Sequence, residues 1–98
     1  MSNILYSILI PYADYRLIKS NVGCKSVESS LGSRPSLSEC ANACRNTENC
    51  HFFIYGKGWL KKGWCYWEKT SEASCPEGWE NDNYDFYKLT GGKSYFCD

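Results

Sequence analysis

The chain has 98 residues, among them seven cysteines, and its 11 Lys and Arg residues balance 11 Asp and Glu residues. This length predicts a single domain with a modest core, and the balanced charge argues against nucleic acid or an anionic membrane surface as a partner. Seven cysteines in so short a chain indicate a fold held by disulfides in an oxidising setting, either extracellular or in another lumen. Because seven is odd, one thiol must stay free, bind something or join another chain.

The first ten residues contain a short apolar run that is followed by Pro11. The run is much shorter than the about 20 residues that a transmembrane helix needs, and it lacks the positively charged start of a signal peptide. We expect residues 1–13 to form an arm that docks on the edge of its own domain or on a partner chain; a trimmed signal or anchor segment is the third alternative. The docking side chains would be those of Ile4, Leu5, Tyr6, Ile8, Leu9 and Ile10.

After the arm, residues 15–19 predict a strand, and the Ser- and Gly-rich residues 26–34 predict a loop. Ser36 and Glu39 then have the spacing of a helical capping box. The apolar positions that follow recur with a helical period: Leu37, Cys40, Ala41 and Cys44. The sequence therefore predicts an amphipathic helix that ends near Asn46 and turns both of its cysteines towards the core.

The second half of the chain is rich in strand patterns. Residues 51–55 and 64–68 predict the two strands of a hairpin, because glycines bracket the turn between them. A turn-rich connection over residues 70–83 leads to a last predicted strand at residues 84–89. The expected fold class is α+β: a small, disulfide-stapled module in which one helix packs on an antiparallel sheet.

In this order, the pieces resemble a PAN/apple module over about residues 14–89. The matching parts are the strand that ends near Cys24, the helix start Ser36–Cys40 with the Cys40–Cys44 pair, Cys50 and its strand, Cys65 in the next strand, and the last strand at residues 84–87. The resemblance implies a module that does not catalyse reactions and that binds proteins or carbohydrates. Residues 90–98 would form a tail outside the module.

The resemblance also implies how the cysteines pair. Carried over by position, the bridges that tie the helix to the sheet are Cys40–Cys65 and Cys44–Cys50. A further bridge joins the two ends of an apple module, and here Cys24 has two candidate partners. An antiparallel neighbour would place Cys24 beside the start of the last strand, which favours Cys75, and Cys97 stays the alternative.

Three kinds of chemical site are weighed against this structural reading. A zinc site built from Cys40, Cys44, Cys50 and His51 is disfavoured, because there is only one histidine and other cysteines would go unexplained. A Cys50–His51 catalytic pair is disfavoured because neighbours on a strand face opposite ways. The acidic residues near the last strand, Glu77, Glu80, Asp82 and Asp85, fit a solvated turn better than an acid–base pair or a calcium loop. We expect no catalytic residue, no metal and no cofactor.

The predicted hairpin turn carries the best candidate binding surface. Aromatic rings next to cations suit a partner's acidic patch or a sugar face, and four residues of the turn offer both: Trp59, Lys61, Lys62 and Trp64. If Cys65 faces the helix, Trp67 shares that face and belongs to the core, whereas Trp64 lies opposite. We expect a structural or adhesive subunit that binds other protein chains of an extracellular or lumenal assembly. The alternative is a lectin-like module that binds glycans through Trp59 and Trp64.

Overall fold

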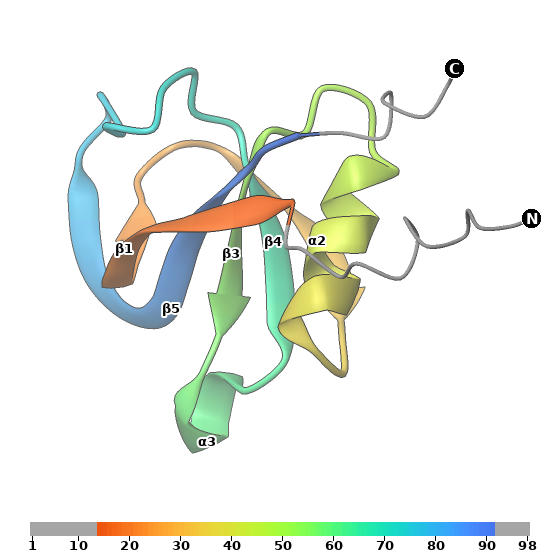
Figure 1. The fold of residues 1–98 in the computed structure, drawn as a ribbon. Coiled ribbons are helices and arrows are strands. Elements are labelled where there is room, and N and C mark those ends of the chain that lie inside the picture. Colours follow the sequence, from red (N-terminus) through yellow and green to blue (C-terminus); the bar gives the residue numbers. More distant parts are fainter. Residues whose placement is uncertain (1–13, 92–98) are drawn as a thin grey trace, which may run out of the picture.

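The computed structural model describes residues 14–91. In this part of the chain, five strands form one antiparallel sheet in the order β1–β5–β3–β4–β2, with a helix against it (Figure 1). The elements are β1 (Tyr15–Cys24), β2 (Glu28–Ser33), α2 (Leu37–Arg45), β3 (Phe52–Gly56), α3 (Gly58–Lys61), β4 (Trp64–Glu68) and β5 (Trp79–Leu89). The predicted fold class, one helix on a disulfide-stapled antiparallel sheet, is confirmed. Among the described residues, no helix has the length and apolar character needed to cross a membrane.

One predicted loop was wrong. Residues 26–34 contain β2, an edge strand that pairs with β4 from Glu28 opposite Glu68 to Ser33 opposite Trp64. Its serines and glycine have low strand propensity, but an edge strand can form from such residues when its neighbour supplies the hydrogen bonds. Gly32, at φ 92°, sits where the register of the two strands shifts. β5 also begins earlier than predicted, at Trp79, because it pairs with the whole of a long β1.

Helix α2 has the predicted start and end. The Ser36 hydroxyl oxygen accepts a hydrogen bond from the backbone N–H of Glu39 (3.2 Å), which caps the first turn. The helix ends at Arg45, and the backbone N–H of its C-cap, Asn46, still donates to the carbonyl oxygen of Asn42. The face turned to the sheet buries Cys40, Ala41 and Cys44. Only nine residues long, this helix would be marginal in isolation, so packing and disulfides must hold it.

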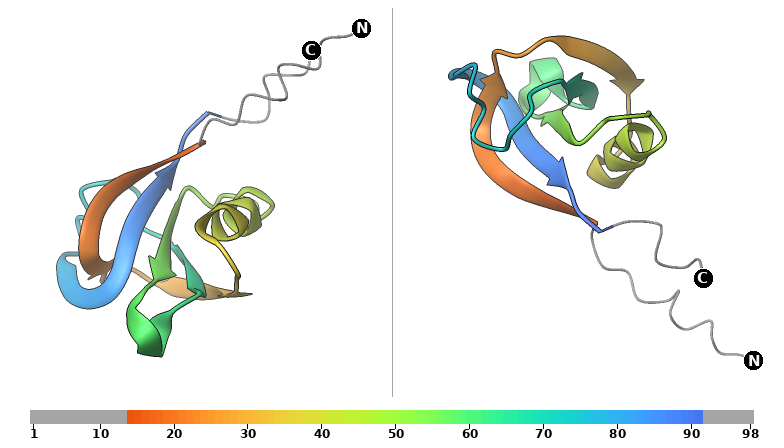
Figure 2. Two further views of the ribbon diagram at one scale, coloured as in Figure 1. Left: turned by 60° about the horizontal axis from the view of Figure 1, so that its bottom comes forward. Right: turned by 90° about the horizontal axis from the view of Figure 1, so that it is seen from above.

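The central strand of the sheet, β3, is buried on both faces. On the helix side, Phe53 packs with the cysteines of α2 and with Cys65 and Trp67 of β4. On the opposite side, a loop-side cluster is covered by the connection between β4 and β5; its buried members are Val22, Cys24, Phe52, Ile54, Cys75, Tyr84 and Phe86. Figure 2 shows β1 and β5 side by side, with α2 on the other side of the molecule. Because both faces of β3 are occupied, binding side chains must come from other parts of the domain.

Candidate functional site

Within residues 14–91, three disulfides fix the frame on which a binding surface would sit. Cys40 bonds to Cys65 and Cys44 to Cys50, with Cα–Cα distances of 5.7 and 5.3 Å. These two bonds join α2 to β4 and to the start of β3, and they are the pairs that the family resemblance implies. The three cysteines weighed as zinc ligands all take part in them.

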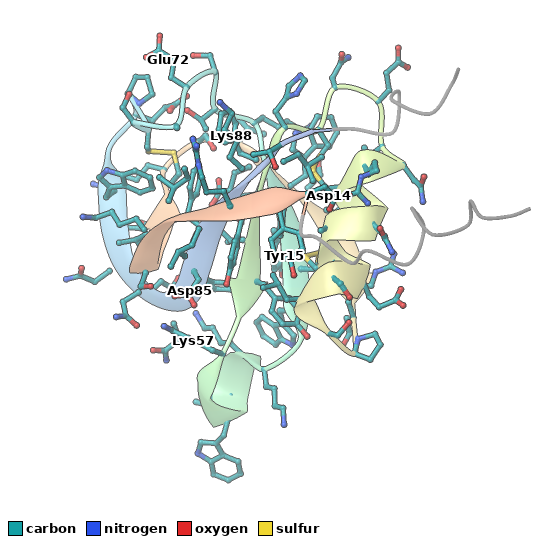
Figure 3. All side chains as sticks on the ribbon, viewed as in Figure 1. Asp14, Tyr15, Lys57, Glu72, Asp85 and Lys88 are labelled. Atoms are coloured by element: carbon teal, nitrogen blue, oxygen red, sulfur yellow. A yellow bond between two sulfur atoms is a disulfide. The ribbon has the colours of Figure 1, made fainter. Side chains whose placement is uncertain are left out.

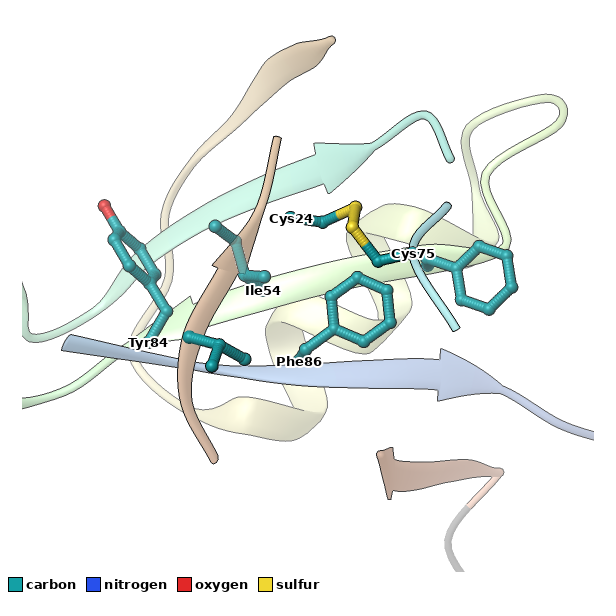
Figure 4. Close-up of a cluster of buried hydrophobic side chains, with 7 residues drawn as sticks. Cys24, Ile54, Cys75, Tyr84 and Phe86 are labelled. Atoms are coloured by element: carbon teal, nitrogen blue, oxygen red, sulfur yellow. A yellow bond between two sulfur atoms is a disulfide. The ribbon is translucent and has the colours of Figure 1, made fainter. Parts of the chain in front are cut away.

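The third disulfide joins Cys24 at the end of β1 to Cys75 in the β4–β5 connection, with a Cα–Cα distance of 5.9 Å. Figure 4 shows it among the side chains of Ile54, Tyr84 and Phe86. The register explains the choice of partner, because Cys24 lies opposite Trp79, the first residue of β5. Cys97, the alternative partner, and the six predicted docking residues of the arm lie outside the described residues.

The exposed aromatic surface is concentrated at the turn between β3 and β4. We call residues 57–64 the α3 tip; they include α3 and the first residue of β4, Trp64. Helix α3 lies beyond the end of the sheet (Figure 1). Trp59 is 90% exposed, Leu60 75% and Trp64 43%. Two large apolar side chains in succession at such exposure are unusual for a small domain whose other aromatic rings are mostly packed.

The α3 tip is held firmly against β5. The backbone N–H of Lys57 donates to the carbonyl oxygen of Asn83 (2.9 Å), and the Lys57 ammonium pairs with Asp85 (2.7 Å; Figure 3). The Lys61 ammonium pairs with Asp82 (2.7 Å), and the backbone N–H of Gly63 donates back to Gly56 (3.2 Å). These contacts fix the backbone of the tip while its apolar side chains stay in solvent.

Not all four predicted binding residues are equally available. Lys61 is half-buried, and its ammonium lies 5.1 Å from the centre of the Tyr84 ring as well as against Asp82. Its hydrogen bond to Asp82 is the main reason why the pKa of that carboxyl lies below its usual value. Lys62 is exposed and follows α3 directly in the sequence. Of the predicted binding residues, Trp59, Lys62 and Trp64 are exposed, and so is Leu60, which sequence reasoning missed. An apolar residue within a predicted turn was the signal for it.

The tryptophans of β4 divide as the strand period requires. Trp67 packs with Cys65 in the helix-side cluster, and the Lys69 ammonium lies 4.5 Å from the centre of its ring. Trp64 stays on the rim, next to β2, where Ser33 is its cross-strand partner. Tyr66, on the same face as Trp64, is nevertheless packed against the loop-side cluster. Only the end of β4 nearest the tip is thus exposed.

A shallow polar hollow of about 400 Å³ lies beside the tip. It is lined by Asn21 of β1 and by Asn81, Asp82 and Asn83 of β5. The register of β1 and β5 shifts here, between Ser20 and Val22, so that β5 bulges opposite Asn21. Amide and carboxylate groups at an open hollow can bind hydroxyl groups, but they offer no nucleophile and base in contact.

A family model described as the PAN domain matches residues 12–92. The chain belongs to the PAN domain family. No curated protein and no solved structure matches it significantly. PAN domains in general are non-enzymatic modules that bind proteins or carbohydrates. The family of the present chain and the three disulfides among its described residues fit an oxidising, extracellular type of environment.

Proposed function

We propose that this PAN domain is a structural or adhesive subunit that binds protein partners in an extracellular or lumenal assembly through the α3 tip. The observation that carries the proposal is the 90% exposure of Trp59 on a turn that β5 holds in place. Exposed tryptophans dominate many binding interfaces because they bury a large apolar area on contact. A fixed backbone means that little further ordering is needed when the partner binds.

The charges around the tip indicate which partner surface would fit. Lys57 and Lys61 are neutralised by Asp85 and Asp82, so they mainly hold the tip. Lys62 is exposed and belongs to the same tip as the exposed Trp59 and Leu60. A protein pocket with apolar walls and an acidic group on its rim would match both features. We place the secondary contacts on Trp64 and, outside the described residues, on the arm residues Ile4–Ile10, with Cys97 as the candidate for attachment to a second chain.

The test begins with mass spectrometry of the native complex without reduction, which identifies both the partner and any interchain disulfide. With that partner, replacing Trp59 with alanine is expected to weaken binding at least about tenfold, or about 1.4 kcal/mol, because the apolar anchor is lost. The stability of the domain should stay unchanged, since the side chain is almost fully exposed. Isothermal titration calorimetry and urea unfolding measure the two quantities.

Val27 offers a matched control, because it is also apolar, is 70% exposed and lies in the β1–β2 turn rather than on the tip. Val27→Ala should leave the affinity unchanged. A native chain that is monomeric and free of partners, or equal losses from Val27→Ala and Trp59→Ala, would count decisively against the proposal.

The second candidate function is carbohydrate binding, which the polar hollow beside the tip favours. A sugar ring stacked on an aromatic side chain of the tip could place its hydroxyl groups near the amides of Asn81 and Asn83. This candidate predicts a glycan-array signal that falls on Trp59→Ala and also on Asn83→Ala. The protein-binding candidate predicts no effect of Asn83→Ala on affinity for the protein partner. A blank array with folded wild-type protein would exclude the carbohydrate function.

A further inference from the structure

The most unusual group in the described structure is the carboxyl of Glu68, at the end of β4. Its residue is completely buried, with 0% exposure, although a glutamate is almost never fully buried without a partner cation. The carboxyl accepts a hydrogen bond from the backbone N–H of Cys24 (3.1 Å) and another from the hydroxyl of Ser26 (2.8 Å). Both donors lie where the chain passes from β1 towards β2, so Glu68 ties this turn to β4.

Across the sheet, Glu68 faces a second carboxyl rather than a cation. Glu28, the first residue of β2, is its cross-strand partner. Two carboxylates directly opposite each other repel, whereas one proton between them converts the repulsion into a hydrogen bond. The register of β2 and β4 therefore places the exposed Glu28 directly opposite the buried Glu68 at the outer edge of the sheet.

The other charged and titratable groups nearby do not neutralise Glu68. Tyr84 on β5 is close enough for both carboxylates to affect its phenol, whose pKa is raised mainly by burial. Glu80, also on β5, approaches the same side of Gly23 as Glu68 does, since a Cβ atom there would lie 3.8 Å from a carboxylate oxygen of each. Glu77 contacts the sulfur of Cys24. None of the three ion pairs within residues 14–91 includes Glu68. Lys69, its neighbour in sequence, faces the ring of Trp67 instead.

We infer that the buried carboxyl of Glu68 keeps a proton that fastens the edge strand β2 to β4 across the pair with Glu28, and that loss of this proton at higher pH releases β2. β2 can respond alone, because within residues 14–91 it lies at the edge of the sheet and pairs with β4 alone. Because Cys24 and Ser26 donate hydrogen bonds to the same carboxyl, the β1–β2 turn should respond to the loss of the proton as well. Cys24–Cys75, on the other side of this turn, limits the movement to β2 and its turn.

The direction of the pH dependence follows from the state in which the proton is held more tightly. Burial first, and then repulsion by Glu28, raise the pKa of Glu68 from 4.5 to about 8, although the hydrogen bonds from Ser26 and Cys24 act against this. Below pH 4.5 both the folded and the unfolded chain keep the proton, so Glu68 does not make the stability depend on pH. Between pH 4.5 and 8 only the unfolded chain loses it, so stability falls as the pH rises. Above pH 8 both states have lost the proton, and Glu68 causes no further fall in the free energy of unfolding.

Two measurements on the full chain test this inference. Between pH 5.5 and 8.5 the unfolding equilibrium constant of the wild type should rise on the order of 10²-fold more than that of Glu68→Gln, which keeps the shape and cannot ionise. Over the same range, hydrogen exchange corrected for its intrinsic rate should show lost protection in residues 28–33 but not in residues 52–56 of the wild type. Glu68→Gln should retain protection in both segments.

Two further variants separate the carboxyl pair from charge effects in general. Glu28→Gln removes the repulsion and should lower the pH dependence without abolishing it. Glu48→Gln, at an exposed residue after α2, should behave like the wild type. Equal pH dependence in the wild type and Glu68→Gln would overturn the inference. The wild-type exchange data test the inference even if a variant fails to fold. Selective release of β2 is contradicted if β2 and β3 both lose protection as the pH rises, or if neither strand does.

Discussion

Replacing Cys40 and Cys65 together with alanine is expected to lower the free energy of unfolding by about 3.5 kcal/mol from chain entropy alone. The bond closes a segment of 25 residues and joins α2 to β4, and both cysteines are completely buried. Without it, the nine-residue helix would depend on the contacts of one narrow face. Urea unfolding followed by tryptophan fluorescence gives the free energy, and far-ultraviolet circular dichroism reports the loss of helix.

The Cys44–Cys50 bond supplies the comparison, because it lies in the same cluster but spans only six residues. The same replacement there should cost about 2.2 kcal/mol, since a shorter loop restrains the unfolded chain less. Equal losses in the two double variants would contradict the chain-entropy argument, and no loss in either would show that the disulfides are not what holds α2 on the sheet.

The second large effect is expected at Gly56, the last residue of β3. A Cβ atom there would lie 2.0 Å from the backbone carbonyl oxygen of Lys61, which is far inside van der Waals contact. Since the obstacle is backbone, Gly56→Ala must displace the α3 tip, with an expected loss of about 3 kcal/mol in stability. Binding through Trp59 should fall as well, because the tip would no longer be held against β5. Urea unfolding and calorimetry with the native partner measure these two losses.

Gly23 provides the control for the loss of a buried glycine. A Cβ atom at Gly23 would have its nearest neighbours at 3.8 Å, which is ordinary contact distance. Gly23→Ala should therefore change stability by less than about 1 kcal/mol and leave binding intact. Comparable losses at the two glycines would show that the close approach of Gly56 to Lys61 has no special importance.

Local signals were sufficient to predict α2 and both strands of the central hairpin. Ser36 caps a helix through its own neighbour Glu39, and a short apolar run such as that of β3 is typical of a buried strand. The edge strand β2 gave no such signal, because it owes its conformation to β4 rather than to its own serines and glycine. Sequence patterns describe local preference, and pairing between distant segments can override it.

In the candidate binding surface, too, the local features could be predicted from the sequence and the long-range contacts could not. Trp59 is exposed because it lies in a turn, which its position between two predicted strands already indicated. Lys61 lies in the same turn, but its partner Asp82 is 21 residues away and could not be inferred from the sequence. Glu68 is the clearest case, since its burial depends on the turn before β2 and on the register with Glu28. A charged residue at the end of a strand gives no warning that its proton will matter.

The α3 tip contains none of the six bonded cysteines and contributes no side chain to either buried cluster. Its outward residues can therefore be exchanged without altering the parts that make the domain fold. What must be kept is small: glycine at 56 and 63, and the lysines that anchor the turn to Asp82 and Asp85. The domain could therefore serve as a scaffold on which new binding sequences replace the exposed residues of the α3 tip while the rest of the fold is kept.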